Sequence, residues 1–134
     1  MEVPILKQGL YLIASVQSAL TDQDLHELRT ALVEQVGKYR SLGVIVDVTA
    51  LDVMDSFACR TLRDIAHMTR LRGAETVIVG IQPEVAFAVV QLGLTLEGVP
   101  TTLDLEEGLA YLDHQIRSKA EEPRPELDDT GSYG

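Results

Sequence analysis

The chain alternates between short apolar runs and longer segments in which apolar residues recur at helical spacing. Residues 3–16 contain two such runs separated by Gln8-Gly9, and the second, from Leu10 to Val16, is almost continuously apolar. A run of this kind is typical of a strand covered on both faces. Pro4 lies in the first run, so we expect that strand at an edge of the sheet, where a missing N–H is tolerated.

Strands and helices then follow one another along the rest of the chain. Three further strands are predicted over residues 44–48, 76–80 and 99–103, and four helices over residues 22–40, 56–71, 83–93 and from 105 to about 117. The second helix has an apolar face suited to packing on a sheet, made of Cys59, Leu62, Ile65, Ala66 and Thr69. The last helix is expected to bury Leu105, Leu109, Leu112 and Ile116.

Polar residues mark the helix starts. Thr21 is a favourable cap for the first helix, with Asp22 and Asp24 near the positive end of its dipole. Ser56 is expected to cap the second helix by accepting a hydrogen bond from the backbone N–H of Ala58 or Cys59. Asp104 and Glu107 form a pair similar to a capping box before the last helix.

The order of elements predicts an α/β fold: a single domain with a mixed, mostly parallel sheet of about five strands and about four helices on its faces. We expect residues 1–120 to form this domain. Residues 121–134 are rich in proline and acidic residues and poor in apolar ones, which predicts a flexible acidic tail.

Composition narrows the function classes. The 134 residues carry a net charge of −10, which argues against nucleic acid as a partner because phosphate backbones are bound by clustered Lys and Arg. A single cysteine, Cys59, excludes an internal disulfide. The sequence shows neither a basic leader nor a long apolar run, so we expect a cytoplasmic protein without membrane contact.

Candidate catalytic and metal-binding chemistry is sparse. Asp47, Asp52 and Asp55 follow a strand and could hold Mg²⁺, but aspartates also favour turns and helix N-termini, and we prefer that interpretation. A phosphate-accepting receiver domain is rejected, because the acidic pair after the first long strand and the lysine after the last strand are missing. We therefore expect no enzyme activity, no cofactor and no metal.

The remaining candidate side chains are the histidines, the cysteine and a group of arginines. The three histidines, His26, His67 and His114, fall on three different helices and form no ligand cluster with Cys59. Cys59 itself is interpreted as a small buried apolar residue rather than a nucleophile. The second helix region carries four arginines: Arg60, Arg63, Arg70 and Arg72. They form either a solvated helix face or a contact strip for a partner.

Two stretches carry a family resemblance. The segment Val46-Asp-Val-Thr-Ala-Leu-Asp-Val-Met-Asp-Ser-Phe57 resembles the signature of STAS domains, the sulfate-transporter and anti-sigma-factor-antagonist fold. Gln91-Leu-Gly-Leu94 and Thr102-Leu-Asp-Leu-Glu-Glu-Gly-Leu109 are similar to later segments of the same domains. The resemblance covers about residues 5–117. Asp55-Ser56-Phe57 departs from the commoner Asp-Ser-Ser/Thr-Gly-Leu and is closer to the small stressosome scaffold proteins of the RsbS type.

The resemblance implies a function and a site. A serine/threonine switch kinase would phosphorylate Ser56, and the unmodified protein would sequester that kinase in a large assembly with STAS-containing sensor paralogues and further copies of itself. The residues expected to contact partners are Asp52, Asp55, Phe57, Arg60 and Arg63. Two alternatives stay open: a simple anti-sigma-factor antagonist in a partner-switching module, and a STAS domain that binds a small ligand.

Overall fold

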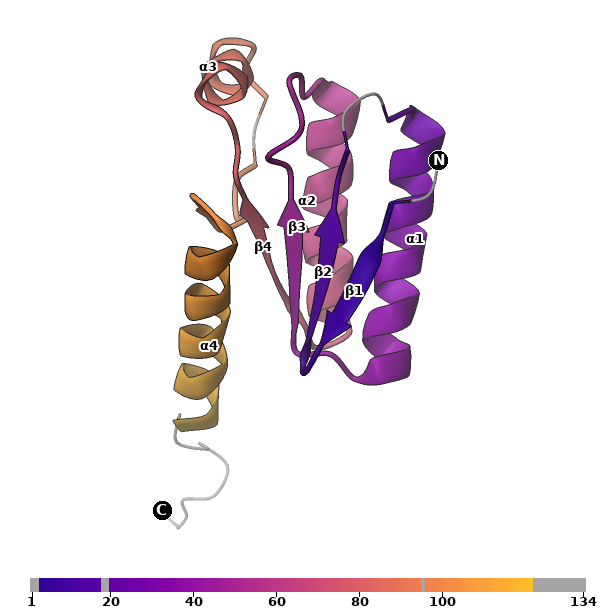
Figure 1. Ribbon diagram of the computed structural model, residues 1–134, viewed down its shortest axis with the longest axis vertical. Helices are drawn as coiled ribbons and strands as arrows, with labels where there is room; N and C mark the ends of the chain where they lie inside the picture. The colour runs from indigo at the N-terminus through magenta and orange to yellow at the C-terminus, as the bar shows by residue number, and fades with distance from the viewer. Residues whose placement is uncertain (1–2, 18–19, 95, 122–134) are drawn as a thin grey trace, which may run out of the picture.

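The computed structural model describes residues 3–17, 20–94 and 96–121 and shows a five-stranded sheet with helices on both faces (Figure 1). The strands are β1 (Ile5–Gln8), β2 (Tyr11–Ser15), β3 (Gly43–Asp47), β4 (Glu75–Val79) and β5 (Thr101–Thr102). The helices are α1 (Asp22–Tyr39), α2 (Ser56–Leu71), α3 (Pro83–Gln91) and α4 (Leu105–Glu121). The tail expected at 121–134 lies outside the described residues after Glu121.

The strands lie in the sheet in their order along the chain. β1 pairs with β2 in antiparallel orientation, and β2, β3, β4 and β5 are parallel to one another. The mixed, mostly parallel sheet predicted from the sequence is confirmed, and so is the position of the first strand at an edge. Parallel order brings the C-terminal ends of β2, β3 and β4 to the same end of the sheet, where their loops meet.

The core has two layers, one on each face of the sheet. α1 and α2 cover one face, against alternate strand residues that include Leu12, Val44 and Val46. α4 covers the other face, where Leu112 packs with Ile13, Ile45, Val77 and Val79. Alternate residues of one strand thus pack into opposite layers of the core, which explains why the strands are continuously apolar in the sequence.

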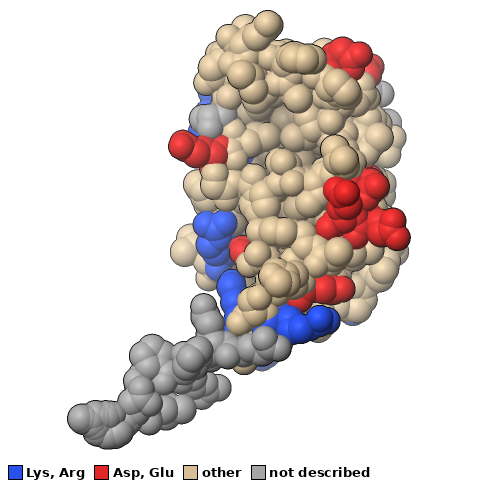
Figure 2. All heavy atoms as spheres, turned by 90° about the vertical axis from the view of Figure 1, so that its left-hand side faces the viewer, with Lys and Arg blue, Asp and Glu red and all other residues tan. Residues whose placement is uncertain are grey.

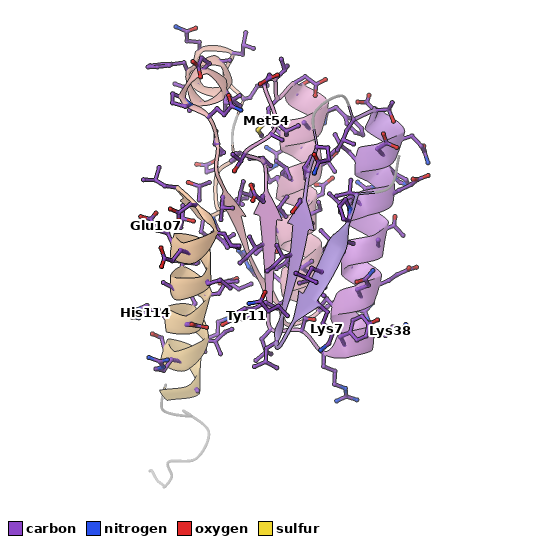
Figure 3. All side chains as sticks on the ribbon, viewed as in Figure 1. Lys7, Tyr11, Lys38, Met54, Glu107 and His114 are labelled. Atoms are coloured by element: carbon purple, nitrogen blue, oxygen red, sulfur yellow. The ribbon has the colours of Figure 1, made fainter. Side chains whose placement is uncertain are left out.

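α4 is also held to the sheet by a polar contact. Tyr11 of β2 lies on the side of the sheet that α4 covers (Figure 3), and its hydroxyl donates a hydrogen bond to the carboxylate of Asp113 on α4. Burial and the adjacent Asp113 raise the pKa of Tyr11 to about 12, so the phenol keeps its proton at neutral pH. The inward stripe predicted for this helix is correct at Leu112, but Leu105 is 37% exposed and lies outside the core.

Two helix caps agree with the sequence. The N–H of Asp24 donates to the Thr21 hydroxyl at 3.1 Å, and the N–H of Thr21 donates to the Asp24 carboxylate at 3.0 Å. Before α4, the N–H of Glu107 donates to Asp104 at 2.9 Å, and Glu107 accepts from the N–H of Leu103 at 3.0 Å. Each pair satisfies N–H groups that have no partner inside the helix.

The last strand is shorter than the predicted 99–103 and comprises only Thr101–Thr102. The flanking backbone groups are engaged elsewhere, because the N–H of Val99 bonds to Leu96 in a turn and that of Leu103 bonds to Glu107. Pro100 between them has no N–H to donate. Val99 is buried, at 8% exposure, but it follows a turn and is not part of the strand, so its apolar character reflects burial and not strand pairing.

Candidate functional site

The loop between β3 and α2 presents a small exposed surface on buried supports. Leu51 and Met54 are 9% and 3% exposed, and Met54 points inward beside the start of α2 (Figure 3). Asp52 and Val53 between them face solvent, and Val53 is 74% exposed. An exposed apolar side chain between two buried ones is held in place, so a partner can contact it without ordering the loop.

The cap of α2 is Asp55 and not Ser56, so the prediction that the Ser56 hydroxyl caps this helix is wrong. Asp55 has the extended backbone of an N-cap residue, with φ −84° and ψ −177°, and its carboxylate accepts from the N–H of Ala58 at 2.9 Å. Ser56 is the first helical residue and is exposed. Its hydroxyl takes no part in the cap, so a group attached there leaves the cap intact.

This assignment predicts different effects for two neighbouring substitutions. Asp55→Ala removes the capping acceptor and is expected to lower the free energy of unfolding by about 1 kcal/mol. Ser56→Ala is the matched control and is expected to change it by less than about 0.5 kcal/mol. Urea unfolding of the two variants checks this prediction. A larger loss of unfolding free energy for Ser56→Ala would mean that Ser56, and not Asp55, caps the helix.

The aspartate at the end of β3 has a local role of its own. Asp47 accepts hydrogen bonds from the N–H and the hydroxyl of Thr49, at 3.0 and 2.6 Å. Gln82, which precedes α3, donates to the Thr49 carbonyl at 2.7 Å and ties this turn to the β4–α3 connection. Asp47 and Asp55 thus serve a turn and a cap, the local roles that aspartates at such positions favour.

No group of three His, Cys, Asp or Glu side chains in the described part of the chain is placed to hold a metal ion. The three carboxylates that suggested Mg²⁺ are used separately or face solvent.

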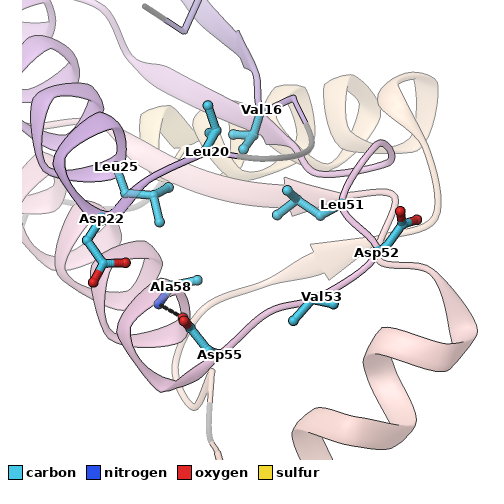
Figure 4. Close-up of a pocket in the computed structure, with 9 residues that line it drawn as sticks. All are labelled: Val16, Leu20, Asp22, Leu25, Leu51, Asp52, Val53, Asp55 and Ala58. Carbon is cyan, nitrogen blue, oxygen red and sulfur yellow. Dashed lines mark hydrogen bonds between the residues drawn. The ribbon is translucent and has the colours of Figure 1, made fainter. Parts of the chain in front are cut away.

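A cleft opens beside Asp55, between the β2–α1 and β3–α2 loops (Figure 4). Its volume is about 350 Å³, and its apolar lining consists of Val16, Leu20, Leu25, Leu51, Val53 and Ala58. Asp22, Asp52 and Asp55 supply its polar lining, and none of the described lining residues is Lys or Arg. The cleft thus combines an apolar floor with a negative rim, next to the exposed Ser56.

The residues predicted to contact a partner divide into two groups. Asp52, Asp55 and Arg60 are exposed, and Arg60 follows Ser56 by one helical turn. Phe57 is half-buried and packs against the core, so only part of its ring is available. Arg63 is also half-buried. Their role in contacts stays a prediction.

The four arginines around α2 do not form one strip. Arg72 ends the helix, and its guanidinium lies against the backbone of Gly37 on α1. Arg70 pairs with Glu75 at 3.5 Å, near the opposite end of the helix from Ser56. Only Arg60 and Arg63 remain close to Ser56 along the helix, which limits the predicted contact strip to these two.

Cys59 is confirmed as a buried side chain, 2% exposed on the face of α2 that packs in the core. Burial and, to a smaller extent, the charge of Asp55 raise the pKa of its thiol, against an opposing effect of Arg63. The neutral thiol is the less reactive form, so the structure gives this residue no nucleophilic role.

Across the parts of the chain that the structure describes, no helix combines the length and apolar character needed to cross a membrane.

Comparisons with known proteins are consistent with this geometry. The family model described as STAS domain matches residues 3–108. RsbT co-antagonist protein RsbRD of Bacillus subtilis (strain 168) is 32% identical over 97 residues, which cover 70% of this chain and 35% of that protein. The chain spans about a third of the length of the curated relatives it matches.

Two solved structures resemble almost the whole domain. A serine-to-glutamate variant of RsbS from Moorella thermoacetica has a TM-score of 0.74 at 33% identity, covering 86% of this chain and 97% of that one. A chain from the molecular architecture of the stressosome, a signal integration and transduction hub, has a TM-score of 0.72 at 34% identity, covering 85% and 99%.

Proposed function

The chain belongs to the STAS domain family, and from this membership we propose that it is a non-catalytic scaffold that captures a serine/threonine switch kinase and releases it when Ser56 is phosphorylated. The proposal includes a cytoplasmic stress-signalling assembly in which STAS-containing sensor paralogues are further partners. The likeness to RsbS over nearly the full length of that protein supports the scaffold role. The relatives named RsbT co-antagonist proteins support STAS-containing paralogues as partners.

The observation that carries the proposal is the position of the Ser56 hydroxyl. It is exposed at the first residue of α2, beside a cap made by Asp55 and a loop held by the buried Met54. A kinase can therefore reach it without local unfolding. Ser56 lies in the sequence between Asp55 and Ala58, which both line the cleft, so a protein bound over the cleft would cover it.

The fold itself should tolerate a phosphate on Ser56. The group adds about −1.5 to −2 charges and three acceptor oxygens at the N-terminus of a sixteen-residue helix, where the dipole and unpaired N–H groups favour negative charge. Arg60, one turn later on the same side of the helix, is close enough along the helix to contribute a charge-assisted hydrogen bond. These effects offset repulsion from the Asp52 and Asp55 carboxylates.

A partner docked over the same surface would not tolerate the phosphate. Contact with Val53 and the cleft would remove water from a dianion that the described lining residues cannot neutralise, since they include no Lys or Arg. A phosphate that engages Arg60 would also compete with any acidic group of the partner. Moving a complex from almost fully bound to almost fully released needs about 5.5 kcal/mol, which the desolvation of one buried dianion can supply.

Phosphate mapping tests this proposal. Incubation with a switch kinase and Mg-ATP, followed by mass spectrometry, should place one phosphate on Ser56 and none on the Ser56→Ala variant. Thr49→Ala is the matched control and should still be modified, because the Thr49 hydroxyl already donates to Asp47 at 2.6 Å and a phosphate there would meet that carboxylate. Modification of Thr49 with Ser56 left untouched would contradict the proposal.

The alternative of a simple anti-sigma-factor antagonist differs in the size of the complex. A scaffold should form a very large particle with sensor paralogues, whereas a partner-switching antagonist binds its kinase in a small complex. Light scattering on a mixture of this chain with such paralogues separates the two, and a small complex under those conditions would favour the antagonist.

A further inference from the structure

α1 and α2 end at the same end of the domain, opposite the end where α2 begins (Figure 1). A hollow of about 430 Å³ opens there between the two helix ends. Its charged lining consists of Arg40, which follows α1, and Arg72, which follows α2. Its uncharged lining includes Gly37 and Ser41, and none of the described lining residues is Asp or Glu. The hollow is therefore positive, in contrast to the cleft beside Ser56.

The hydroxyl of Ser41 is buried at this hollow without a hydrogen-bond partner. Ser41 is 3% exposed, and its Oγ makes no hydrogen bond within the part of the chain that the structure describes. Burying a hydroxyl in this state costs free energy, and buried polar groups are nearly always paired. Because Ser41 lines the hollow, an acceptor atom bound there would supply the missing partner.

The two arginines of the hollow are unpaired as well. Neither the Arg40 nor the Arg72 guanidinium makes an ion pair or a hydrogen bond with any of the residues in the described ranges. Arg29 and Arg70, by comparison, each pair with an acidic residue. The chain carries a net charge of −10, so acidic partners are plentiful. Two free guanidinium groups beside an unpaired hydroxyl are a set of donors suited to an oxyanion.

The local backbone is adapted to this arrangement. Gly37 lies within α1, where glycine is less favourable than alanine, but a Cβ at this position would overlap the Arg72 guanidinium. Arg40 has φ +53°, a conformation that helix ends usually give to glycine. The helix dipoles account for a cation at each helix end. They do not account for the glycine that makes room for Arg72, or for the unpaired hydroxyl of Ser41.

Other basic side chains lie at the same end of the molecule. On the face that Figure 2 shows, most Lys and Arg atoms lie toward the lower end, and Figure 3 places Lys7 and Lys38 near the end of α1. The carboxylate of Glu75 faces the other side of the sheet, since its alternate neighbour Val77 packs with Leu112 under α4. A local positive potential of this kind concentrates anions in a protein that repels them elsewhere.

We propose that this hollow binds the phosphate group of a small phosphorylated molecule. The guanidinium groups of Arg40 and Arg72 donate to the phosphate oxygens from the two helix ends, and the Ser41 hydroxyl donates from the floor between them. A phosphate suits these donors because its oxygens point in several directions and guanidinium groups bind it in a bidentate manner. The hollow is larger than one phosphate, which leaves room for an organic group beside Leu42.

This site is separate from the proposed kinase switch. α2 begins at Ser56 and ends before Arg72, and its sixteen residues hold the two sites about 24 Å apart. No residue lines both the hollow and the cleft. The phosphate site can therefore be absent while kinase capture stands, and the reverse.

A nuclear magnetic resonance titration with sodium phosphate tests the proposal, with sodium chloride added to keep the ionic strength constant. The amide signals of Arg40, Ser41 and Gly73 should shift and saturate. Arg40→Gln and Arg72→Gln should each weaken binding about tenfold or more. Arg117→Gln is the matched control, because Arg117 is exposed on α4 and does not line the hollow, and it should change the affinity by less than about twofold.

Gly37→Ala tests the position of the guanidinium without removing any charge. The added methyl group would displace the Arg72 guanidinium, so phosphate binding should weaken about fivefold or more. The flexible arginine side chain can move aside, and alanine favours the helix, so the domain should unfold at the same or a higher urea concentration. Unchanged phosphate affinity in this variant would contradict the assigned role of Arg72.

Ser41→Ala tests the unpaired hydroxyl. It should weaken phosphate binding about fivefold, while the midpoint of urea unfolding in phosphate-free buffer stays the same or rises, because the variant no longer buries an unpaired group. A lower midpoint in phosphate-free buffer would show that the hydroxyl already has a partner inside the domain, and would overturn its role as a donor to the ligand.

Titration with adenosine monophosphate identifies the source of the phosphate group. Tighter binding than inorganic phosphate would assign the site to an organic phosphomonoester, and equal binding would assign it to the phosphate group alone. Shifts that do not saturate, shifts of the same size with sodium chloride alone, or binding that persists in both Arg40→Gln and Arg72→Gln would each overturn the proposal.

Discussion

Ser56→Glu is expected to weaken capture of the switch kinase about 100-fold, a loss of about 2.7 kcal/mol in binding free energy. The carboxylate carries about half the charge of a phosphate, so about half of the 5.5 kcal/mol of a complete switch is the appropriate scale. The domain should hardly change in stability, because Ser56 is exposed and Asp55 keeps the helix cap. The midpoint of thermal unfolding should stay within about 3 °C of the wild type.

The matched control for this result is Ser56→Gln, which has nearly the same size and shape as the glutamate but no charge. Calorimetric titration of the kinase into each variant separates the two effects. If charge drives release, the glutamine variant should bind within about tenfold of the wild type. Equal losses for both variants would mean that bulk at this position, and not charge, breaks the contact. Undiminished binding by Ser56→Glu would contradict the proposed switch.

Gly80→Ala is expected to lower the free energy of unfolding by about 3 kcal/mol, from two separate causes. Gly80 has φ +83°, a conformation that is strained for any residue with a side chain. A Cβ there would also overlap the Thr49 hydroxyl and come within 3.3 Å of the Asp47 carboxylate. The turn between β3 and α2 would therefore have to shift, and its hydrogen bond from Thr49 to Asp47 would be lost.

Gly73 offers the control for this substitution. It too has positive φ, +92°, but a Cβ there would have no atom within 4 Å. Gly73→Ala should therefore cost only the backbone strain, about 1 kcal/mol. Urea unfolding of both variants and of the double variant Gly80→Ala/Thr49→Ala completes the test. Removing the Thr49 hydroxyl relieves the closest overlap, so the double variant should lose less than the two single losses added together.

Much of the fold could be predicted from local pattern. The bounds of α2 agree with the predicted 56–71 because its apolar face, the aspartate that precedes it and Gly73, which follows it, all indicate the same helix. β3 and β4 agree to within a residue because both are β-branched runs between turn residues. The predicted β5 was too long, because Val99 is buried after a turn and outside the strand, and an apolar residue alone does not distinguish the two positions.

The error at the start of α2 has a clear physical origin. Aspartate and serine are both favoured caps, and here they stand side by side, so composition does not decide between them. The backbone decides, because Asp55 is extended and Ser56 is already helical. The correction makes the proposed switch simpler, since a phosphate on Ser56 does not disturb the hydrogen bond that starts the helix.

The sequence pattern predicted neither the cleft nor the exposed apolar side of α3, where Phe87 and Val90 are 70% and 77% exposed. The cleft joins Val16 and Leu25 to Leu51 and Ala58, and only the parallel order of β2 and β3 brings these segments together. The sequence of α3 is apolar on all sides, but a helix of that kind is normally assigned to the core, so its pattern does not predict an exposed side. Whether Phe87 or Val85 faces the core depends on how α3 packs against the rest of the domain.

The two borders of the sheet limit how this domain can join another protein. β5 offers only two residues for pairing, and the proline before it has no N–H to give. β1 is four residues long, with a proline before it and a lysine within it, the means by which natural sheets discourage the addition of a foreign strand. Growth by extending the sheet, the route to fibrils, is thereby disfavoured. Any ordered particle built from this domain must grow through contacts between side-chain surfaces. Such contacts can be specific for one partner, and a single added charge can break them.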